Sequence, residues 1–383
     1  MAKLGEVCKV SASTKMIDKS KAWLLNLDMV EQQTGRVVEY NFVGEDGLNG
    51  SITQFDTENV LYSKLRPNLN KVVLPERDGF CTSELLPLRP DARKLDRSYL
   101  AVFLRSDGFV NWAVSKTAGA KMPRLGTKDL LNANIPLPEI KEQKAIAEKF
   151  KKSEELISLR KQQLVKMDEL VKARFFEMFG EISDNSMNWD CFTIGKLIST
   201  IESGWSGNGK QREKHADEIA VLKVSAVTKG YFIPTECKVL DDQHNIKKYV
   251  YPQKGDILFS RANTKEMVGA TVLIKKDYPD LILPDKLWKI RFCTDVNPIY
   301  MKYVLSTTTV RNAFSAASTG TSGSMYNVSM EKFKGVIIPV PPLSVQNEFA
   351  AFVERVDQQK QTVQQSLEKL ELMKKALMQE YFG

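Results

Sequence analysis

The chain has 383 residues, of which 43% are hydrophobic and 27% are charged, with 21 Gly and 15 Pro. This composition argues against a collagen-like or disordered chain, and the length allows two domains with separate cores. No apolar run approaches the roughly 20 residues of a membrane helix, and the N-terminus lacks the apolar stretch of a signal peptide, so we expect a cytoplasmic protein. The formal net charge of +8 weakly favours a polyanionic partner.

Residue types that bind metals are few and scattered. The chain has only two histidines, His215 and His244, and no Cys-x-x-Cys pair among its five cysteines, which are Cys8, Cys81, Cys191, Cys237 and Cys293. We therefore expect neither a disulfide framework nor a structural zinc site, and we interpret the cysteines as reduced thiols that mostly fill the core.

Residues 1–138 are predicted to form a globular α/β domain. β-rich runs such as "KVVLP" alternate with Gly, Asn and Asp turns, and a helical pattern lies near residues 98–116. The sequence lacks the regular strand–helix alternation of a doubly wound sheet, so we expect mainly antiparallel, twisted sheets.

Residues 139–180 are predicted to form one long helix. The lead "IPLP" places proline before the first turn, and the chain then continues without Gly or Pro to a closing Phe-Gly at 179–180. About 40 residues correspond to about 60 Å of helix. An apolar lane with a repeat of seven residues, typical of a coiled-coil seam, consists of Phe150, Ile157, Leu164, Val171 and Met178.

Residues 181–341 repeat the globular pattern and residues 342–383 repeat the helix. The second domain carries the runs "IAVLKVSAV", "DILFS", "ATVLI" and "LWKIRF" and a helical pattern near 298–317. The second helix follows "IPVP" and has the lane Phe349, Val356, Val363, Leu370 and Leu377, partly doubled by Val353 and Leu367.

The two helical segments are an internal repeat. Residues 135–180 and 338–383 align without a gap at an offset of 203, with matches that include Pro136 and Pro339, Gln143 and Gln346, and both Phe-Gly endings. Looser matches lie upstream: "LGEV" with "IGKL", "VLYSKLRP" with "ILFSRANT", and "DRSYLAVFLRS" with "NPIYMKYVLS".

We therefore predict an α+β chain of two pseudo-twofold-related globular domains, separated by two long helices that form an intramolecular antiparallel coiled coil. The alternative is that each helix packs only on its own globular half. Pairing is favoured because a helix of about 60 Å outruns a domain of this size.

Loops between the predicted strands are rich in basic and small polar residues. They are "SASTK" (11–15), "SKLRPNLNK" (63–71), "GAKMPR" (119–124), "SGWSGNGKQR" (203–212), "SRANTK" (260–265) and "STGTSGS" (318–324). Lys and Arg neutralise phosphates, and Ser, Thr, Asn and Arg bond to phosphates or base edges, so the recurrence of such loops in both halves indicates DNA binding.

The sequence does not contain a convincing set of catalytic residues. "NPIY" at 297–300 is similar to the signature with which amino-methyltransferases hold a target amine, but its repeat partner "DRSY" indicates a helix N-cap. "PEIKEQK" has the Glu-x-Lys of nucleases without a suitably placed second acid, and the chain lacks a Gly-x-x-x-x-Gly-Lys-Ser/Thr loop. We expect a non-catalytic chain.

Taken together, the doubled layout, the "IPLP…Q" and "IPVP…Q" leads, the Phe-Gly endings and "GDILFSR" (255–261) resemble the specificity subunit of type I restriction–modification enzymes. "SKLRPNLNKV" (63–72) is similar to the family's equivalent segment in the other domain, although "TENVLYSK" departs from the better match "KGDILFSR".

The resemblance implies a function and a set of partners. Each globular part is then a target recognition domain for one half of a bipartite, asymmetric site in double-stranded DNA, and the helices set the spacing between the halves. Two modification subunits that use S-adenosylmethionine to methylate adenine N6, and two restriction subunits that use ATP and Mg, are implied as partners; no cofactor is expected in this chain, and no membrane partner.

Within this interpretation we expect DNA contacts from basic residues of the loops. In the first half these are Lys64, Arg66, Lys71, Lys121 and Arg124, and in the second half Lys210, Arg212, Arg261 and Lys265. Two other interpretations stay open: a non-catalytic coiled-coil interaction protein with incidental basic loops, and a cryptic nuclease or methyltransferase.

Overall fold

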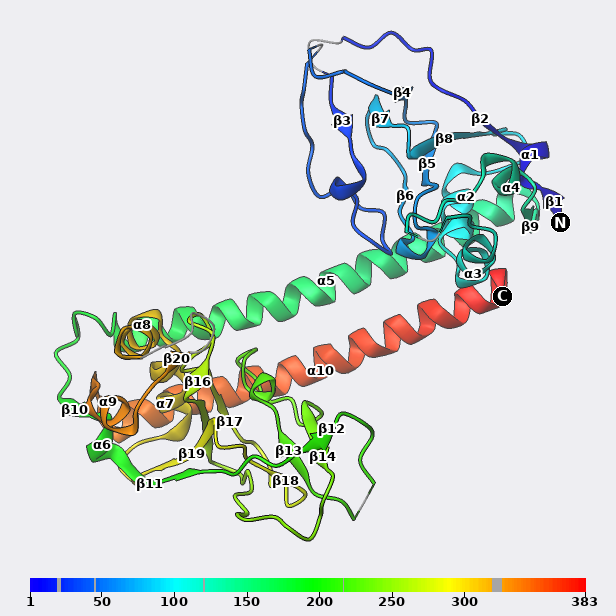
Figure 1. Ribbon diagram of the computed structural model, residues 1–383. Helices are drawn as coiled ribbons and strands as arrows, with labels where there is room; N and C mark the ends of the chain where they lie inside the picture. The colour runs from blue at the N-terminus through cyan, green and yellow to red at the C-terminus, as the bar shows by residue number, and fades with distance from the viewer. Residues whose placement is uncertain (19–21, 45, 120, 216, 319–325) are drawn as a thin grey trace. The chain divides into compact units, whose positions relative to one another are not determined.

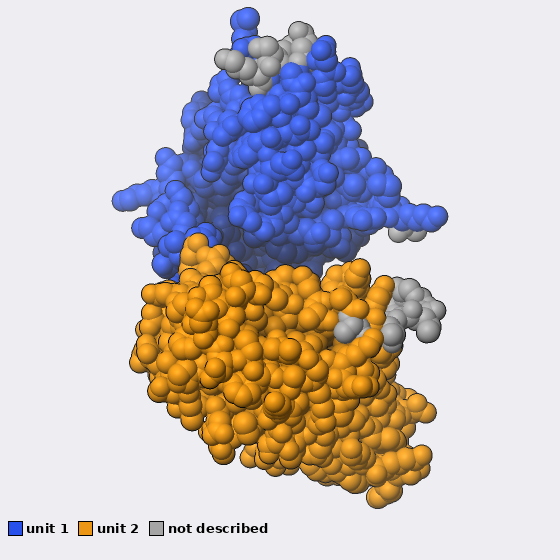
Figure 2. Space-filling model, turned by 90° about the vertical axis from the view of Figure 1, so that its left-hand side faces the viewer, with its two compact units in different colours: residues 1–163, 363–383 blue, residues 164–362 orange. Residues whose placement is uncertain are grey.

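The computed structural model describes residues 1–383 except 19–21, 45, 120, 216 and 319–325. The chain divides into two compact units, which Figure 2 draws in different colours. Unit 1 comprises Met1–Gln163 and Val363–Gly383, and unit 2 comprises Leu164–Thr362. Both long helices cross the boundary between the units, and the predicted division at residues 138, 180 and 341 stays a prediction.

The main sheet of unit 1 is antiparallel, with the strand order β2-β8-β5-β6 (Figure 1). These strands are β2 (Cys8–Val10), β8 (Leu85–Pro90), β5 (Val60–Ser63) and β6 (Val72–Val73). Their apolar side chains share a core with α1 (Leu4–Val7), α2 (Arg97–Leu104), α3 (Asp107–Ser115) and α4 (Thr127–Leu131). A strand pair of β1 (Ala2–Lys3) and β9 (Asn134–Ile135) leads into α5 (Ile140–Phe179).

A second sheet of unit 1 has the order β3-β7-β4, from β3 (Leu24–Leu25), β7 (Gly79–Thr82) and β4 (Ile52–Phe55). β3 runs parallel to β7, and β4 runs antiparallel to it. Trp23, Leu25 and Phe55 belong to the separate core of this sheet. Short 3-10 turns, η2 (Leu27–Met29) and η3 (Pro67–Leu69), lie in the connecting loops.

The main sheet of unit 2 repeats that of unit 1, with the order β11-β19-β15-β17. Its strands are β11 (Ile198–Ser203), β19 (Leu287–Phe292), β15 (Ile257–Ser260) and β17 (Thr271–Leu273). The accompanying helices are α6 (Ile194–Leu197), α7 (Pro298–Ser306), α8 (Thr308–Ala317) and α9 (Met330–Gly335). Here β10 (Cys191–Thr193) pairs with β21 (Ile337–Pro339) ahead of α10 (Leu343–Phe382).

The second sheet of unit 2 has the order β12-β14-β13-β18. Its strands are β12 (Gly209–Lys210), β14 (Cys237–Leu240), β13 (Ala220–Leu222) and β18 (Leu281–Ile282), and the parallel pair is β13 with β18. In unit 2 the antiparallel strand β14 pairs with β13, the first strand of the parallel pair, whereas in unit 1 the antiparallel strand β4 pairs with β7, the second strand of that pair. The second sheets of the two units therefore differ in strand order, although the main sheets agree.

Most predicted elements are confirmed, with two corrections. The run "IAVLKVSAV" is a strand only over Ala220–Leu222, since Val224–Ala226 forms the 3-10 turn η4. The helical patterns near 98–116 and 298–317 are each two helices, because the side chains of Ser106 and Thr307 accept a backbone N–H and begin a new helix there.

Equivalent buried glutamines attach each long helix to its domain. Gln143 Oε1 accepts the N–H of Asp96 at 2.8 Å, and Gln346 Oε1 accepts the N–H of Asn297 at 2.8 Å. Asp96 and Asn297 in turn cap α2 and α7, which confirms the capping interpretation of "DRSY" and "NPIY". The sequence repeat therefore preserves a specific hydrogen-bond network.

Within each unit the two long helices run antiparallel. In unit 1, Lys374 of α10 pairs with Glu154 of α5 at 2.7 Å, and Glu154 also lies 3.7 Å from Arg105 at the end of α2. In unit 2, Lys360 pairs with Asp168 at 2.6 Å. The predicted lanes face inward: Phe150, Val171, Phe349, Val356 and Val363 are buried, and the other lane residues are partly buried.

The closing phenylalanine of each helix packs into the domain at the beginning of the other helix. Phe382 lies against Tyr99 and Phe150 in unit 1, with ring centroids 5.3 and 6.3 Å away. Phe179 lies against Tyr300 and Phe349 in unit 2, at 4.8 and 5.3 Å. The repeated Phe-Gly ending thus completes two equivalent cores.

Candidate nucleic-acid interface

The chain leaves the end of β5 in a tight corner that gathers basic residues. Ser63 is buried, and its hydroxyl donates to the carbonyl of Leu65 at 2.9 Å. Leu65 forms a β-bridge with Arg124, and the N–H of Leu125 donates to the carbonyl of Lys64 at 2.9 Å. We call residues 63–66 together with 123–125 the β5 corner.

Four of the DNA-binding residues predicted for the first half come together there. Arg66 has a left-handed backbone with φ of 49°, and its N–H donates to Pro123 at 2.8 Å. The guanidinium of Arg66 also donates to the carbonyl of Lys121, at 3.5 Å. Arg66, Lys121 and Arg124 are exposed, and Lys64 is half-buried. The corner therefore presents cations to solvent.

Lys71 points elsewhere, toward the connection between the two sheets of unit 1. Its ammonium donates to the carbonyl of Leu27, and burial lowers its pKa although the nearby Asp28 carboxylate opposes that shift. The contact holds η2 against the main sheet. Its geometry is that of a structural lysine.

The end of β15 forms the same corner in unit 2. The hydroxyl of buried Ser260 lies 3.5 Å from the carbonyl of Ala262, and the N–H of Val328 donates to Arg261 at 2.9 Å. Here the bridge extends into a strand pair of β16 (Ala262–Asn263) with β20 (Tyr326–Asn327). We call residues 260–263 together with 326–328 the β15 corner.

The predicted basic residues of the second half are distributed differently. Arg261 is half-buried and its Nε donates to the carbonyl of Asp285 at 2.8 Å, whereas Lys265 is exposed just past the corner. Lys210 is an exposed residue of β12 in the second sheet. Arg212 is bound to Glu218 through both terminal nitrogens and to the Glu213 carbonyl.

The loops predicted from composition are only partly free. The hydroxyl of Ser206 bonds to the carboxylate of Asp285, so "SGWSGNGKQR" begins beside Arg261. Of "STGTSGS", residues 319–324 lie outside the described residues. Two residues of "SASTK", Ser13 and Lys15, contact a buried carboxylate. The sequence gives no sign of this contact.

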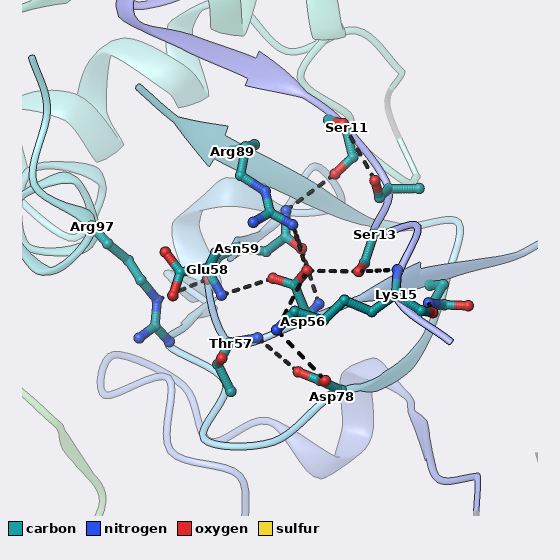
Figure 3. Close-up of polar contacts among 12 residues, drawn as sticks. Ser11, Ser13, Lys15, Asp56, Thr57, Glu58, Asn59, Asp78, Arg89 and Arg97 are labelled. Carbon is teal, nitrogen blue, oxygen red and sulfur yellow. Dashed lines mark hydrogen bonds and ion pairs between the residues drawn. The ribbon is translucent and has the colours of Figure 1, made fainter. Parts of the chain in front are cut away.

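That carboxylate belongs to Asp56, at the turn before β5. Figure 3 shows Ser13, Lys15 and Arg89 directed toward it. Ser13 donates to Oδ2 at 2.6 Å, Arg89 lies at 2.6 Å, and Lys15 lies at 4.0 Å. Burial by itself would raise the pKa of Asp56, but the hydrogen bonds from Ser13 and Arg89 lower it to about 2.

Unit 2 builds the same feature with the acid at a different position of the turn. The carboxylate there is Asp256, fully buried and bound by Arg291 at 2.5 Å and by Lys289 at 3.3 Å. In both turns the side chain of the fourth residue accepts the N–H of the first, Asn59 from Asp56 and Asp256 from Gln253.

Sequence reasoning missed the polar residues that share the corners. Glu84 binds Arg124 at 2.9 Å, which lowers the pKa of Glu84 and raises that of Arg124. Asn263 and Asn327 occupy in the β15 corner the positions of Arg66 and Arg124. The match of "VLYSKLRP" with "ILFSRANT" aligns Arg66 with Asn263, but asparagine carries no charge and is therefore absent from a prediction based on basic residues.

Neither a metal-binding group nor a membrane-spanning helix is found among the described residues. No group of three or more His, Cys, Asp or Glu among them is placed to hold a metal ion. None of the helices in the described ranges is long and apolar enough to cross a membrane.

The chain is similar to known proteins over both halves. A family model described as the type I restriction modification DNA specificity domain matches residues 1–168 and again 188–372. The EcoKI specificity subunit of Escherichia coli strain K12 is 26% identical over 284 residues, which cover 70% of this chain and 60% of that protein. The EcoDI specificity subunit of Escherichia coli is 31% identical over 117 residues, 30% of this chain and 26% of that protein.

Solved structures have the same fold. A chain from a study of the assembly and conformational transition of the type I R-M system has a TM-score of 0.59 at 19% identity, covering 100% of this chain and 96% of that one. The S subunit of a type I restriction–modification system from M. genitalium has a TM-score of 0.58 at 12% identity, with 100% and 95% covered. The match to the EcoKI subunit spans about 60% of its length. Since the family model matches both halves, the chain belongs to the family of type I restriction–modification DNA specificity domains.

Proposed function

We propose that this chain is the DNA-specificity subunit of a type I restriction–modification complex and performs no chemistry itself. Each unit contributes one recognition domain, and each domain reads one half of a bipartite, asymmetric site. The two family matches, one in each half of the chain, support this assignment.

The duplicated corner is the observation that carries the proposal. The same backbone hydrogen bonds recur in the β5 and β15 corners, from Leu125 to Lys64 and from Val328 to Arg261, both at 2.9 Å. A cation follows the buried serine in each corner. One scaffold built twice with different exposed side chains is suited to two different half-sites.

Cations in and beside the two corners supply phosphate contacts in this proposal. Lys64, Arg66, Lys121 and Lys265 are available for that role, and Lys210 adds one from β12. We assign Lys71 and Arg212 structural roles because their donors are already bound inside their units. Loss of one phosphate contact weakens binding to all sequences alike and reduces the salt slope by about one.

The paired helices provide the docking surface for two methyltransferase subunits. Apolar side chains remain exposed along them, including Leu159, Val165, Leu170, Leu372 and Met373, and such residues gathered on helices mark protein contacts. Those partners bring S-adenosylmethionine for N6 methylation of adenine, and two restriction subunits bring ATP-dependent translocation and cleavage with Mg.

A map of N6-methyladenine in host cells with the gene intact and with the gene deleted tests the function. Deletion is expected to remove one bipartite motif, and restoration of the gene is expected to return it. An unchanged map, with methylation by the partner subunits otherwise active, contradicts the proposal and favours an interaction protein.

A further inference from the structure

The two corners place different side chains on equivalent backbone positions. In the β5 corner the residue bridged to Leu65 is Arg124, and in the β15 corner the residue bridged to Ala262 is Asn327. The residue that follows Arg124 or Asn327 donates its N–H to the cation next to the buried serine in both corners. The equivalent bridges and hydrogen bonds therefore align Arg124 with Asn327.

Arg124 is held with one edge of its guanidinium free. Its Nε lies 3.2 and 3.3 Å from the two carboxylate oxygens of Glu84, and its Nη2 lies 2.9 Å from Oε1. A guanidinium has five N–H groups in a plane, so the end formed by Nη1 and the second N–H of Nη2 stays available. Arg124 is exposed at that position.

A free guanidinium edge matches guanine. Two parallel N–H donors fit the O6 and N7 acceptors that guanine shows in the major groove, and a carboxylate that fixes the other edge removes the entropy of orienting the side chain. Arg212 is held the other way round, because both of its terminal nitrogens bind Glu218 and the end edge that is free in Arg124 is filled.

Asn327 offers the corresponding group in unit 2. Its side chain is half-buried and makes no hydrogen bond with the residues that the structure describes. Asn263 is already committed, since its oxygen accepts the N–H of Thr264 at 2.9 Å and its amide lies 3.4 Å from Ser260 Oγ. A carboxamide with one donor and one acceptor free matches N6 and N7 of adenine.

We propose that Arg124 and Asn327 are equivalent base-reading residues, of which Arg124 reads a guanine in one half-site and Asn327 reads an adenine in the other. This assignment rests on the proposed DNA-specificity function and names the bases at one position of each half-site. Glu84 is a positioning residue for Arg124.

Methylation motifs of variants in the native complex test the assignment. The full-length chain is returned to the gene-deleted host as wild type, as Arg124→Lys, which keeps the charge and loses the fork, or as Asn327→Ala. Arg124→Lys is expected to relax a single guanine position of one half-site, and Asn327→Ala a single adenine position of the other half-site. Discrimination against the best competing base at that position is expected to fall about 5- to 140-fold.

Arg212→Lys is the matched control, because the end edge proposed to read a base in Arg124 is filled by Glu218 in Arg212. Its motif is expected to equal that of the wild type. Glu84→Gln is expected to relax the same guanine position as Arg124→Lys, which a role of Glu84 in folding alone does not produce.

The outcomes separate the assignment from the function on which it rests. A wild-type motif that both variants leave intact overturns the assignment alone, as does relaxation at other bases or in one half-site only. If gene deletion removes no motif, the function and the assignment are both wrong. For a variant that abolishes methylation, the purified chain is tested on duplexes with single base-pair changes: selective loss at one position supports the assignment, and equal loss at all positions overturns it.

Discussion

A buried carboxylate with two cations stands at the start of the central strand in each unit. Asp56 is bound by Arg89 and Lys15, and Asp256 is bound by Arg291 and Lys289. Arg89 and Arg291 follow equivalent residues of β8 and β19, since Val60 pairs with Leu88 as Ile257 pairs with Ile290. Each turn therefore has one carboxylate and two cations. The acid is the first residue of the turn in unit 1 (Asp56) and the fourth in unit 2 (Asp256), and an amide side chain, Asn59 or Gln253, occupies the other position.

This exchange predicts a rescue experiment. Asp56→Gln alone leaves Arg89 half-buried without its carboxylate and is expected to lower the free energy of unfolding by about 3–5 kcal/mol, the range for a broken buried ion pair. Adding Asn59→Asp recreates the order of Gln253 and Asp256 and is expected to recover a large part of that loss. Urea unfolding of the two single variants and the double variant measures the coupling, and strictly additive effects would contradict the equivalence of the turns.

The low pKa of Asp56 predicts a pH dependence. Its pKa falls from 3.8 in the unfolded chain to about 2 in the folded state, so between these pH values the unfolded chain binds more protons. The stabilisation from Asp56 is therefore complete above about pH 4 and is lost as the pH falls toward 2. Thermal unfolding across this range is expected to show a shallower decline for Asp56→Asn than for the wild type, and identical slopes count against the ion pair.

Each long helix ends by completing the core of the domain at the start of the other helix. Phe179 contacts Tyr300 and Phe349, and Phe382 contacts Tyr99 and Phe150. Along their middle portions the helices bury Val363 and Leu367, whereas Leu159 and Val165 stay exposed. The aromatic ends add a further apolar contact at each end of the pair.

Truncation of the aromatic ends is predicted to be costly. Phe179→Ala and Phe382→Ala are each expected to destabilise the chain by about 3–5 kcal/mol, the range for a phenylalanine removed from a core. Phe176→Ala is the matched control, since Phe176 lies one turn from Phe179 and is 44% exposed; an effect below about 1 kcal/mol is expected. Equal losses for Phe176 and Phe179, measured by denaturant unfolding, contradict this account of the cores.

At the element scale the repeat made most of the structure predictable. The constant offset aligned Gln143 with Gln346 and both Phe-Gly endings, and these residues make equivalent contacts. The strand order of the second sheets was not predictable. β4 pairs with β7 in unit 1 and β14 pairs with β13 in unit 2, and each choice depends on packing between segments distant in sequence. The breaks at Ser106 and Thr307 were missed because an apolar pattern hides a capping residue.

The site was harder to predict than the fold, since a count of cations does not show which donors are already bound. Arg124 and Arg212 are both exposed arginines in basic loops, but Glu84 leaves one edge of Arg124 free whereas Glu218 fills that edge of Arg212. The difference depends on which side of the guanidinium the carboxylate approaches. Such an approach is fixed by folded neighbours far apart in sequence.

At the scale of the whole molecule, the two units are joined by helices that both cross the unit boundary. Under the proposed function their length sets the unspecified gap between half-sites. Residues 161–167 and 361–367 are opposed segments: the pair of Asp168 with Lys360 lies just beyond them. The first segment contains the lane residue Leu164, and the second contains Val363 together with Leu367 of the doubled lane. Because each segment is one heptad long, removal of both keeps the heptad spacing of both lanes.

Deletion of both seven-residue segments shortens each helix by about 10 Å, and at about 3.4 Å per base pair the gap in the methylation motif is expected to shrink by about three base pairs. The half-site sequences are expected to stay the same, because neither corner changes. Deletion from α5 alone is the control: it leaves helices of unequal length and is expected to abolish methylation. A retained motif with its original gap in the double deletion shows that another part of the complex sets the spacing.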